Sequence, residues 1–341
     1  MVKKIIHVII FIGGLMENKR RKKLIALLTG VSVIGSSYSA CLIGQRFSIE
    51  KYYMVKMQNI SISKNFYTYS DTIIDTNTKM PYQKEMVPQG LALCGDYYLI
   101  SYYDSSYLNN SKIITINKNG DVINSVSLAN KAHTGGICYD SENKWLWVSG
   151  EKGCIDIYDI EDIIKSEEAT PLYNDIYVGD DLPNYKNLFE NSVSYLTIFK
   201  GKLYVGSFSL LGEGMVKEYQ IDKANLTLIR EFSVPTKVQG LSFYSKNDND
   251  YILFSRSYSN VPSLIQIFKY DESISDYFNN NDYVYYVAPA MLEQITLSED
   301  NLYAIYESAA DLYRKKNKVT HDEVCVSDCE KVINSRSFNN L

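Results

Sequence analysis

The stretch MVPQGLALCGDYYLISYYD, residues 86–104, contains the unit from which most of the chain is built. Two apolar runs rich in Leu, Ile and Tyr flank Gly95 and Asp96, a pair that favours the tight turn of a β-hairpin. Gln89 precedes most of the first run, and Asp104 follows the second. The sequence therefore predicts a hairpin with polar groups at both of its free ends.

The same plan recurs four more times along the chain. Each repeat has a polar residue, a strand, a tight turn, a second strand, a polar loop and a third strand, and the repeats begin at Gln89, His133, Ser194, Gln239 and Glu293. A spacing of roughly 45 to 60 residues is typical of a four-stranded propeller blade. Fourth strands are expected at residues 122–128 and 226–232, and the third strand of the last repeat at residues 310–313. The predicted fold is all-β, a β-propeller of five or six blades.

The predicted organisation divides the chain into five parts. Residues 1–23 are a basic cytoplasmic stub, and 24–44 are a signal anchor or signal peptide. Residues 1–15 read as the product of a wrongly assigned start codon, with Met16 as the natural start. Residues 56–84 supply a closing strand or a partial blade, because short apolar runs occur at 60–62 and 72–75. The propeller covers residues 85–313, with a short helical decoration at 160–168. Residues 314–341 form a tail, either solvated or a short closing element.

Composition excludes some functions and favours others. The chain has 341 residues, 45% of them hydrophobic, and a formal net charge of −5, so it has a substantial core and no broad basic surface for nucleic acid. Tyr occurs 30 times, and tyrosine suits both half-buried strands and binding faces.

The N-terminal region predicts the compartment. Five consecutive basic residues, 19–23, precede an uncharged stretch at 24–44 that is long enough to cross a hydrocarbon core of roughly 30 Å. Basic residues stay on the cytoplasmic side, which places the propeller outside. Three alternatives stay open: a retained anchor, a secretory signal cleaved near Ser39, and lipidation at Cys41. The sequence before Cys41 resembles a bacterial lipobox, except that Tyr38 stands where that motif has an aliphatic residue.

The six cysteines have no spacing typical of a zinc site. Cys94, Cys138 and Cys154 fall in predicted strands and are expected to be small buried residues. Cys325 and Cys329 could form a local disulfide in an oxidising compartment, or could stay reduced.

The candidate site follows from the fold. In a propeller, the start of each innermost strand lies on the same face as the end of the second strand, so the polar residues at these positions converge. One ring is expected to contain Gln89, His133, Ser194, Gln239 and Glu293, with Tyr195 and Gln294 beside them. A wider ring is expected to contain Tyr102, Asp104, Glu151, Ser207, Arg256, Glu307 and Ser308. Such a mixture of side chains suggests a shaped ligand pocket, although the same groups could simply bond to neighbouring strands or water.

Within these rings, the predicted ligand-binding residues are Gln89, His133, Tyr195, Gln239, Glu293, Asp104, Arg256 and Glu307. His133 is one of three histidines and lies in KAHTGG, residues 131–136, where two glycines permit close backbone approach. Glu293 and Glu307 are candidate metal ligands, because calcium binds several oxygen atoms. Calcium is therefore a possible cofactor, with none certain.

The motifs VPQGLA (87–92), KAHTGGICYD (131–140), VQG (238–240) and YESAA (306–310) resemble a group of secreted or membrane-anchored bacterial β-propeller proteins, mostly uncharacterised. This resemblance implies the fold and the compartment but no activity. A weaker similarity is to the gluconolactonase-like six-bladed propellers, which implies a calcium-dependent lactone hydrolase. The chain departs from that pattern, since its first inner strand has Gln89 where those enzymes have Glu.

Serine-nucleophile, zinc-protease and phosphate-loop motifs are missing from the sequence. The expected function is therefore an extracytoplasmic, membrane-anchored module that binds a cell-envelope component, sugar, peptide or other small ligand through its channel face. The alternative is a metal-dependent hydrolase in which Glu293 or Glu307 holds calcium and His133 is the general base.

Overall fold

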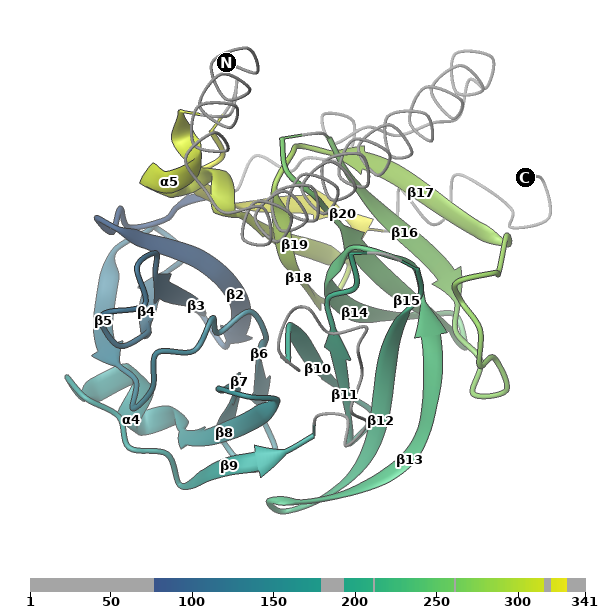
Figure 1. The fold of residues 1–341 in the computed structure, drawn as a ribbon, viewed down its shortest axis with the longest axis horizontal. Coiled ribbons are helices and arrows are strands. Elements are labelled where there is room, and N and C mark those ends of the chain that lie inside the picture. Colours follow the sequence, from purple (N-terminus) through teal and green to yellow (C-terminus); the bar gives the residue numbers. More distant parts are fainter. Residues whose placement is uncertain (1–76, 179–192, 211, 261, 316–319, 330–341) are drawn as a thin grey trace, which may run out of the picture. The chain divides into compact units, whose positions relative to one another are not determined.

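The computed structural model describes residues 77–178, 193–210, 212–260, 262–315 and 320–329, all of which belong to one compact unit, Asn65–Leu341. Five antiparallel sheets of four strands each succeed one another along the chain. Figure 1 shows these sheets arranged as blades around a common centre. The all-β prediction and the propeller are confirmed, and the described residues form five blades.

Four blades are built from consecutive strands, and in each the first strand is innermost. Blade 1 consists of β2 (Met86–Cys94), β3 (Tyr97–Asp104), β4 (Lys112–Asn117) and β5 (Val122–Ser127). Blade 2 consists of β6 (Ile137–Asp140), β7 (Trp145–Ser149), β8 (Cys154–Asp159) and β9 (Tyr173–Tyr177), with the short helix α4 (Ile160–Lys165) after β8. Blade 3 consists of β10 (Tyr195–Phe199), β11 (Lys202–Ser207), β12 (Gly214–Asp222) and β13 (Asn225–Val234). Blade 4 consists of β14 (Val238–Lys246), β15 (Asn249–Arg256), β16 (Ser263–Lys269) and β17 (Tyr283–Ala288).

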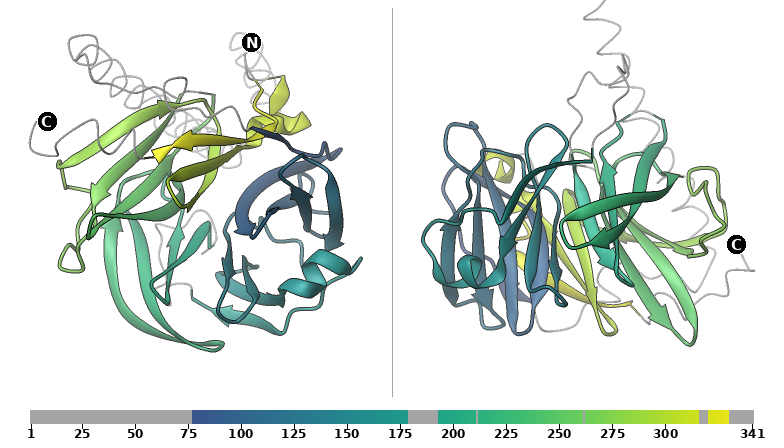
Figure 2. Two further views of the ribbon diagram at one scale, coloured as in Figure 1. Left: turned by 180° about the vertical axis from the view of Figure 1, so that it is seen from behind. Right: turned by 90° about the horizontal axis from the view of Figure 1, so that it is seen from below.

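Blade 5 combines two distant parts of the chain. Its strands are β18 (Leu292–Ser298), β19 (Asn301–Tyr306), β20 (Glu323–Asp328) and, outermost, β1 (Thr78–Lys79). Strand β1 pairs with β20, and the Thr78 hydroxyl donates to the Lys118 carbonyl of blade 1 at 3.0 Å. Figure 2 shows the yellow last blade beside the blue first blade. The predicted runs at 60–62 and 72–75 lie outside the described residues.

The prediction of a third strand at residues 310–313 is wrong. Those residues form part of a helical turn, η1 (Glu307–Ala309) followed by α5 (Asp311–Arg314). Ala, Leu and Arg favour helix, and Asp311 lies in the first turn, where a negative charge is favourable. The third strand is β20, whose valines favour a strand. It lies within residues 314–341, for which the sequence predicts a tail or a short closing element.

The apolar core lies between neighbouring blades rather than at the centre of the ring. Leu99 and Ile113 of blade 1 pack with Leu146 and Tyr158 of blade 2, and similar clusters join blades 2 and 3, blades 4 and 5, and blades 5 and 1. Each small sheet therefore buries its faces against its neighbours, which is how a propeller limits its exposed edges.

Serine and glycine at the repeat positions connect the inner strands of adjacent blades. The Ser101 hydroxyl accepts from Gly90 N at 2.8 Å and donates to the Thr134 carbonyl at 2.7 Å, so it bridges blade 1 to the start of blade 2. A Cβ atom at Gly90 would lie 2.5 Å from the Ser101 hydroxyl, so this position admits only glycine without rearrangement. Ser255 repeats the bridge by donating to the Glu293 carbonyl at 2.7 Å. These contacts explain why the repeats carry a glycine directly after Gln89 and Gln239.

The described part of the chain contains no helix long and apolar enough to span a membrane. The predicted anchor at 24–44 and the basic stub before it lie outside the described residues.

Cysteines at 94, 138, 154, 325 and 329 are all recorded as thiols. Cys325 and Cys329 are buried in the core of blade 5 and are not joined by a disulfide. Cys138 is buried as expected, whereas Cys94 and Cys154 are only partly buried.

Candidate functional site

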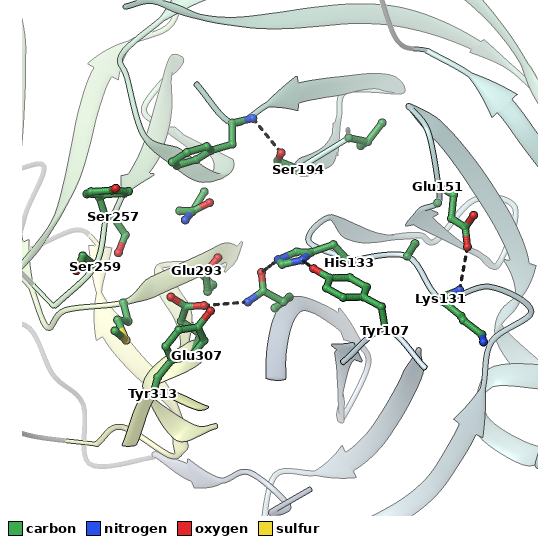
Figure 3. Close-up of a pocket in the computed structure, with 18 of the residues that line it drawn as sticks. Tyr107, Lys131, His133, Glu151, Ser194, Ser257, Ser259, Glu293, Glu307 and Tyr313 are labelled. Atoms are coloured by element: carbon green, nitrogen blue, oxygen red, sulfur yellow. Dashed lines mark hydrogen bonds between the residues drawn. The ribbon is translucent and has the colours of Figure 1, made fainter. Parts of the chain in front are cut away.

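A pocket of about 950 Å³ is lined by residues from all five blades. Gln89, His133, Ser194, Gln239 and Glu293 line it from the starts of the innermost strands or the residues just before them. Glu151 and Glu307, which follow second strands, line it as well. The predicted convergence of these positions is confirmed, while their role in ligand binding stays a prediction. Figure 3 shows Glu293, Glu307 and Tyr313 on one wall, with Lys131 and Glu151 on the opposite side.

A chain of hydrogen bonds crosses the pocket from blade 1 to blade 5 (Figure 3). Gln89 Nε2 donates to Glu307 Oε2 at 3.4 Å, and Gln89 Oε1 lies 2.8 Å from His133 Nε2. His133 Nδ1 in turn lies 2.9 Å from the Tyr107 hydroxyl. Because the Gln89 amide nitrogen donates to Glu307, its amide oxygen faces His133. The His133 Nε2–H then donates to Gln89, and Nδ1 accepts from Tyr107.

His133 is held as a neutral ring. Its imidazole stacks on Tyr103, with ring centroids 4.0 Å apart, and both ring nitrogens have the partners described above. The ring opens to the pocket on one side, but the loss of bulk water around it lowers the pKa of His133 to about 4. At neutral pH it therefore adds no positive charge to the pocket.

Glu293 is the most deeply buried acid that lines the pocket, with 4% of its surface exposed. Burial raises its pKa well above the ordinary value, and the charge of Glu307 raises it further. Burial, together with Glu307, also raises the pKa of Tyr313 to about 12. This wall therefore combines two interacting carboxyl groups with a neutral phenol.

The backbone at the pocket is strained at several positions. Tyr107, Lys152, Ser259 and Met291 line the pocket with φ values between 53° and 65°, and Thr134, next to His133, has a φ of 49°. Left-handed backbone is unfavourable for side chains larger than glycine, and most of all for a β-branched residue such as threonine. The same conformation also occurs in turns away from the pocket, for example at Lys200 and Glu299, so it does not by itself mark this site as functional.

Three of the predicted ligand-binding residues do not line the pocket. Tyr195 is fully buried beneath β11, where a Cβ atom at Gly206 would lie 2.1 Å from its ring. The Arg256 guanidinium donates to the Thr236 carbonyl at 2.9 Å and to Gln266 Oε1 at 3.0 Å. Asp104 accepts from the backbone of Ser106, Leu108 and Asn109, so it shapes the loop that carries Tyr107. These residues were expected to reach the channel because their repeat positions match, but their side chains point into local structure.

Gln294, expected beside the inner ring, is also structural. Its Oε1 accepts from Leu91 N at 3.2 Å and from Ile137 N at 3.1 Å, and its Nε2 donates to the Ile137 carbonyl at 2.6 Å. One buried amide thus ties the inner strands of blades 5, 1 and 2 together.

Several lining residues were not predicted. They lie in the loops after the second strands or beside the inner strands: Tyr107, Lys152, Phe208, Ser257, Tyr258, Ser259, Met291 and Tyr313. These loops differ in length, so no fixed repeat spacing marks them. Tyr313 was missed because residues 310–313 were expected to form a strand.

The predicted calcium ligands Glu293 and Glu307 lie together at the pocket, but in the described ranges no group of three or more His, Cys, Asp or Glu side chains is arranged to hold a metal ion. Two carboxyl groups supply fewer oxygen ligands than the six to eight that calcium takes.

No protein-family model matches this sequence, and no curated protein matches it. Among solved structures, it is similar to a chain in a nidogen/laminin complex, with 12% identity, a TM-score of 0.41, and coverage of 65% of this chain and 73% of that one. It is also similar to hydrazine synthase of Kuenenia stuttgartiensis, with 10% identity, a TM-score of 0.36 and coverage of 64% and 61%. U3-55K has 10% identity, a TM-score of 0.44 and coverage of 75% and 99%.

At identities of 10–12% and TM-scores of 0.36–0.44, these similarities do not indicate a function. The resemblances to bacterial propeller proteins and to gluconolactonase-like enzymes gain no support from the sequence comparisons. The order of strands in its five sheets identifies the described part of the chain as a five-bladed β-propeller.

Proposed function

We propose that this protein is a binding module that holds a sugar, a peptide or another small polar ligand in its channel pocket. The observation that carries the proposal is the pocket of about 950 Å³ to which every blade contributes polar side chains. Its volume falls in the range of ligand sites, and its lining combines hydrogen-bonding groups with the rings of Tyr107, Phe208, Tyr258 and Tyr313. Aromatic rings offer apolar faces to a sugar or peptide, while the amides and acids fix its orientation.

A binding screen tests this proposal. The full chain is titrated with cell-envelope sugars and peptides, first by thermal shift and then by calorimetry. We expect at least one compound to bind, and we expect His133→Ala and Gln239→Ala to weaken it at least tenfold. Glu142→Gln, in the exposed turn between β6 and β7, is the matched control and should bind normally. Unchanged affinity in both pocket variants would overturn the proposal.

We also propose that the propeller lies outside the cell membrane, anchored through the apolar residues 24–44. The support is the sequence pattern of five basic residues followed by an uncharged stretch of membrane-spanning length. A C-terminal alkaline phosphatase fusion, which is active only outside the cytoplasm, tests it. Activity in the membrane fraction that is lost on deleting residues 19–44 supports the proposal, and an inactive fusion to the intact chain contradicts it.

A calcium-dependent hydrolase is the second candidate, and the pairing of Glu293 with Glu307 favours it. Against it, both ring nitrogens of His133 are engaged, so a general base there would first have to leave Gln89 or Tyr107. A calcium-dependent rise in melting temperature together with turnover of lactones or phosphoesters would establish this function. The absence of both would remove it.

A further inference from the structure

Glu293 differs from every other buried acid in the part of the chain that the structure describes. Five acidic residues are buried there: Asp104, Asp140, Asp156, Glu218 and Glu293. The first four accept hydrogen bonds, Asp140 from Glu142 N and Asn143, and Asp156 from Asn130 and Asp175 N. Among the described residues, no donor contacts the Glu293 carboxyl group. A buried carboxyl group without a donor is costly, so its position at a pocket indicates that the missing donor belongs to a ligand.

The groups around Glu293 indicate which charge the ligand's donor group carries. Glu307 adds a second carboxyl group to the same wall, and its Oε2 accepts from Gln89 (Figure 3). His133 and Tyr313 are neutral, so they do not offset the negative charge. The cations that line the pocket, Lys131 and Lys152, are exposed, and Lys131 lies on the side opposite this wall. An anionic group would be repelled here, whereas a cationic donor would be attracted.

We infer that the ligand carries a primary ammonium group, which binds to the wall formed by Glu293 and Glu307. This inference rests on the proposed binding function and specifies its ligand class. An ammonium group has three donors and no acceptor, which complements the Glu293 carboxyl group. The ring of Tyr313, on the same wall, can add a cation–π contact. A calcium ion fits less well, because two carboxyl groups leave most of its coordination sphere unfilled.

Matched pairs of small probes test this inference. Glucosamine is compared with N-acetylglucosamine and glucose, and triglycine amide with its N-acetyl form, so that the sugar and peptide sources of an amine are tested separately. Each probe is titrated into the full chain by calorimetry at pH 7. We expect the free amine of at least one set to bind at least tenfold more tightly than its neutral counterparts.

Variants show whether the preference arises at the proposed wall. Glu293→Gln keeps the shape of the side chain, introduces donors and cannot ionise, so it should reduce the preference for the amine at least tenfold. Glu142→Gln should leave it unchanged, and circular dichroism checks that both variants are folded. Equal binding of amine and neutral probes, a preference that survives in Glu293→Gln, or no binding by any amine would overturn the inference. Equal binding of the probes, or a preference that survives in Glu293→Gln, would leave the proposed binding function intact. If no amine binds, the screen of envelope sugars and peptides described above decides whether the protein binds a ligand at all.

Discussion

Glu218 in blade 3 and Glu293 in the channel are both buried glutamates, but their surroundings differ. Burial tends to raise the pKa of Glu218, but hydrogen bonds from Lys202 and Arg230, each 2.7 Å away, outweigh it and hold the pKa below its ordinary value. Glu293 has no such partner among the residues that the structure describes, and its pKa is raised. Glu218 lies on β12, the third strand of blade 3, and accepts a hydrogen bond from Tyr270 of blade 4. The contrast shows that the supply of donors, rather than burial, separates an acid that holds the fold together from one that is available to a ligand.

The largest loss of stability is expected from removing Glu218, whose buried carboxylate is paired with Lys202 and Arg230. Glu218→Ala leaves Lys202 and Arg230 without their buried carboxylate, and removing one member of a buried ion pair costs about 3 to 5 kcal/mol of unfolding free energy. Urea unfolding of the full chain measures it. Glu231→Ala on the neighbouring strand is the control, because that acid is largely exposed and 3.9 Å from Lys217, and it should cost less than about 1 kcal/mol. Equal losses in the two variants would remove the distinction between the sites.

Asp104 is a buried acid whose partners are neutral hydrogen-bond donors, so it tests whether a buried acid needs cations to stabilise it. It accepts from backbone and side-chain groups of Ser106 and Asn109, and hydrogen bonds from Ser106 and Asn109 lower its pKa to about 2 despite some desolvation. Asp104→Ala should cost about 2 kcal/mol, the value of hydrogen bonds to a charged group. Because the folded pKa is depressed, this stability is present above about pH 4 and is lost as the pH falls toward 2.

Unfolding measured at a series of pH values compares the wild type with Asp104→Asn. The stability difference between them should shrink as the pH falls from 5 to 2. A constant difference over that interval would show that the charge of Asp104 is not what its loop stabilises.

Glu293→Gln should increase the free energy of unfolding, in contrast to the losses expected for Glu218→Ala and Asp104→Ala. The folded state binds the Glu293 proton more tightly than the unfolded state, so the contribution of this group is largest at low pH and declines as the pH rises through the raised pKa. Within that interval the wild type loses at most about 1.4 kcal/mol per pH unit from this group, and Glu293→Gln removes the slope. We expect a gain of about 1 kcal/mol at pH 8, measured by urea unfolding. Destabilisation at every pH would mean that the carboxyl group is compensated in the folded protein.

Tyr195→Phe should have the smallest effect. In the described residues the Tyr195 hydroxyl is buried without a hydrogen-bond partner, so its removal should change stability by less than about 1 kcal/mol, in the stabilising direction. Tyr204→Phe is the matched comparison, because the Tyr204 hydroxyl lies 2.9 Å from that of Tyr270, and it should lose about 1 kcal/mol. A thermal melt distinguishes the two, and a marked loss in Tyr195→Phe would indicate a partner such as bound water.

The fold could be predicted because its determinants are local and repeated. Gly90 and Gly240 recur at one position because Cβ atoms there would clash with Ser101 and with Gln294, and this requirement is visible as a sequence pattern. The closing strand was harder to locate, because β1 has two residues and gains its structure from pairing with β20. A strand that short has no periodicity of its own.

The candidate site was predictable in position but not in detail. The repeat correctly brings His133, Gln239 and Glu293 to one pocket, since equivalent ends of strands must converge around a ring. It does not determine side-chain direction in irregular loops, so Asp104 and Arg256 turn into local hydrogen bonds. Tyr107 was missed for a related reason, because Asp104 and a left-handed backbone together place it at the pocket.

The pairing of β1 with β20 also sets the order in which the pocket can form during synthesis. Asn77 and Glu323, which share a hydrogen bond, are 246 positions apart, so the first strand leaves the ribosome long before its partner exists. Gln89 is translated early, whereas Glu293 and Glu307 come from the last blade. A nascent chain stalled with residue 315 just outside the exit tunnel still lacks β20. We expect a protease to cleave this chain near residue 78, and we expect the released full chain to resist cleavage at the same position. The pocket is therefore complete only after the last blade has been translated.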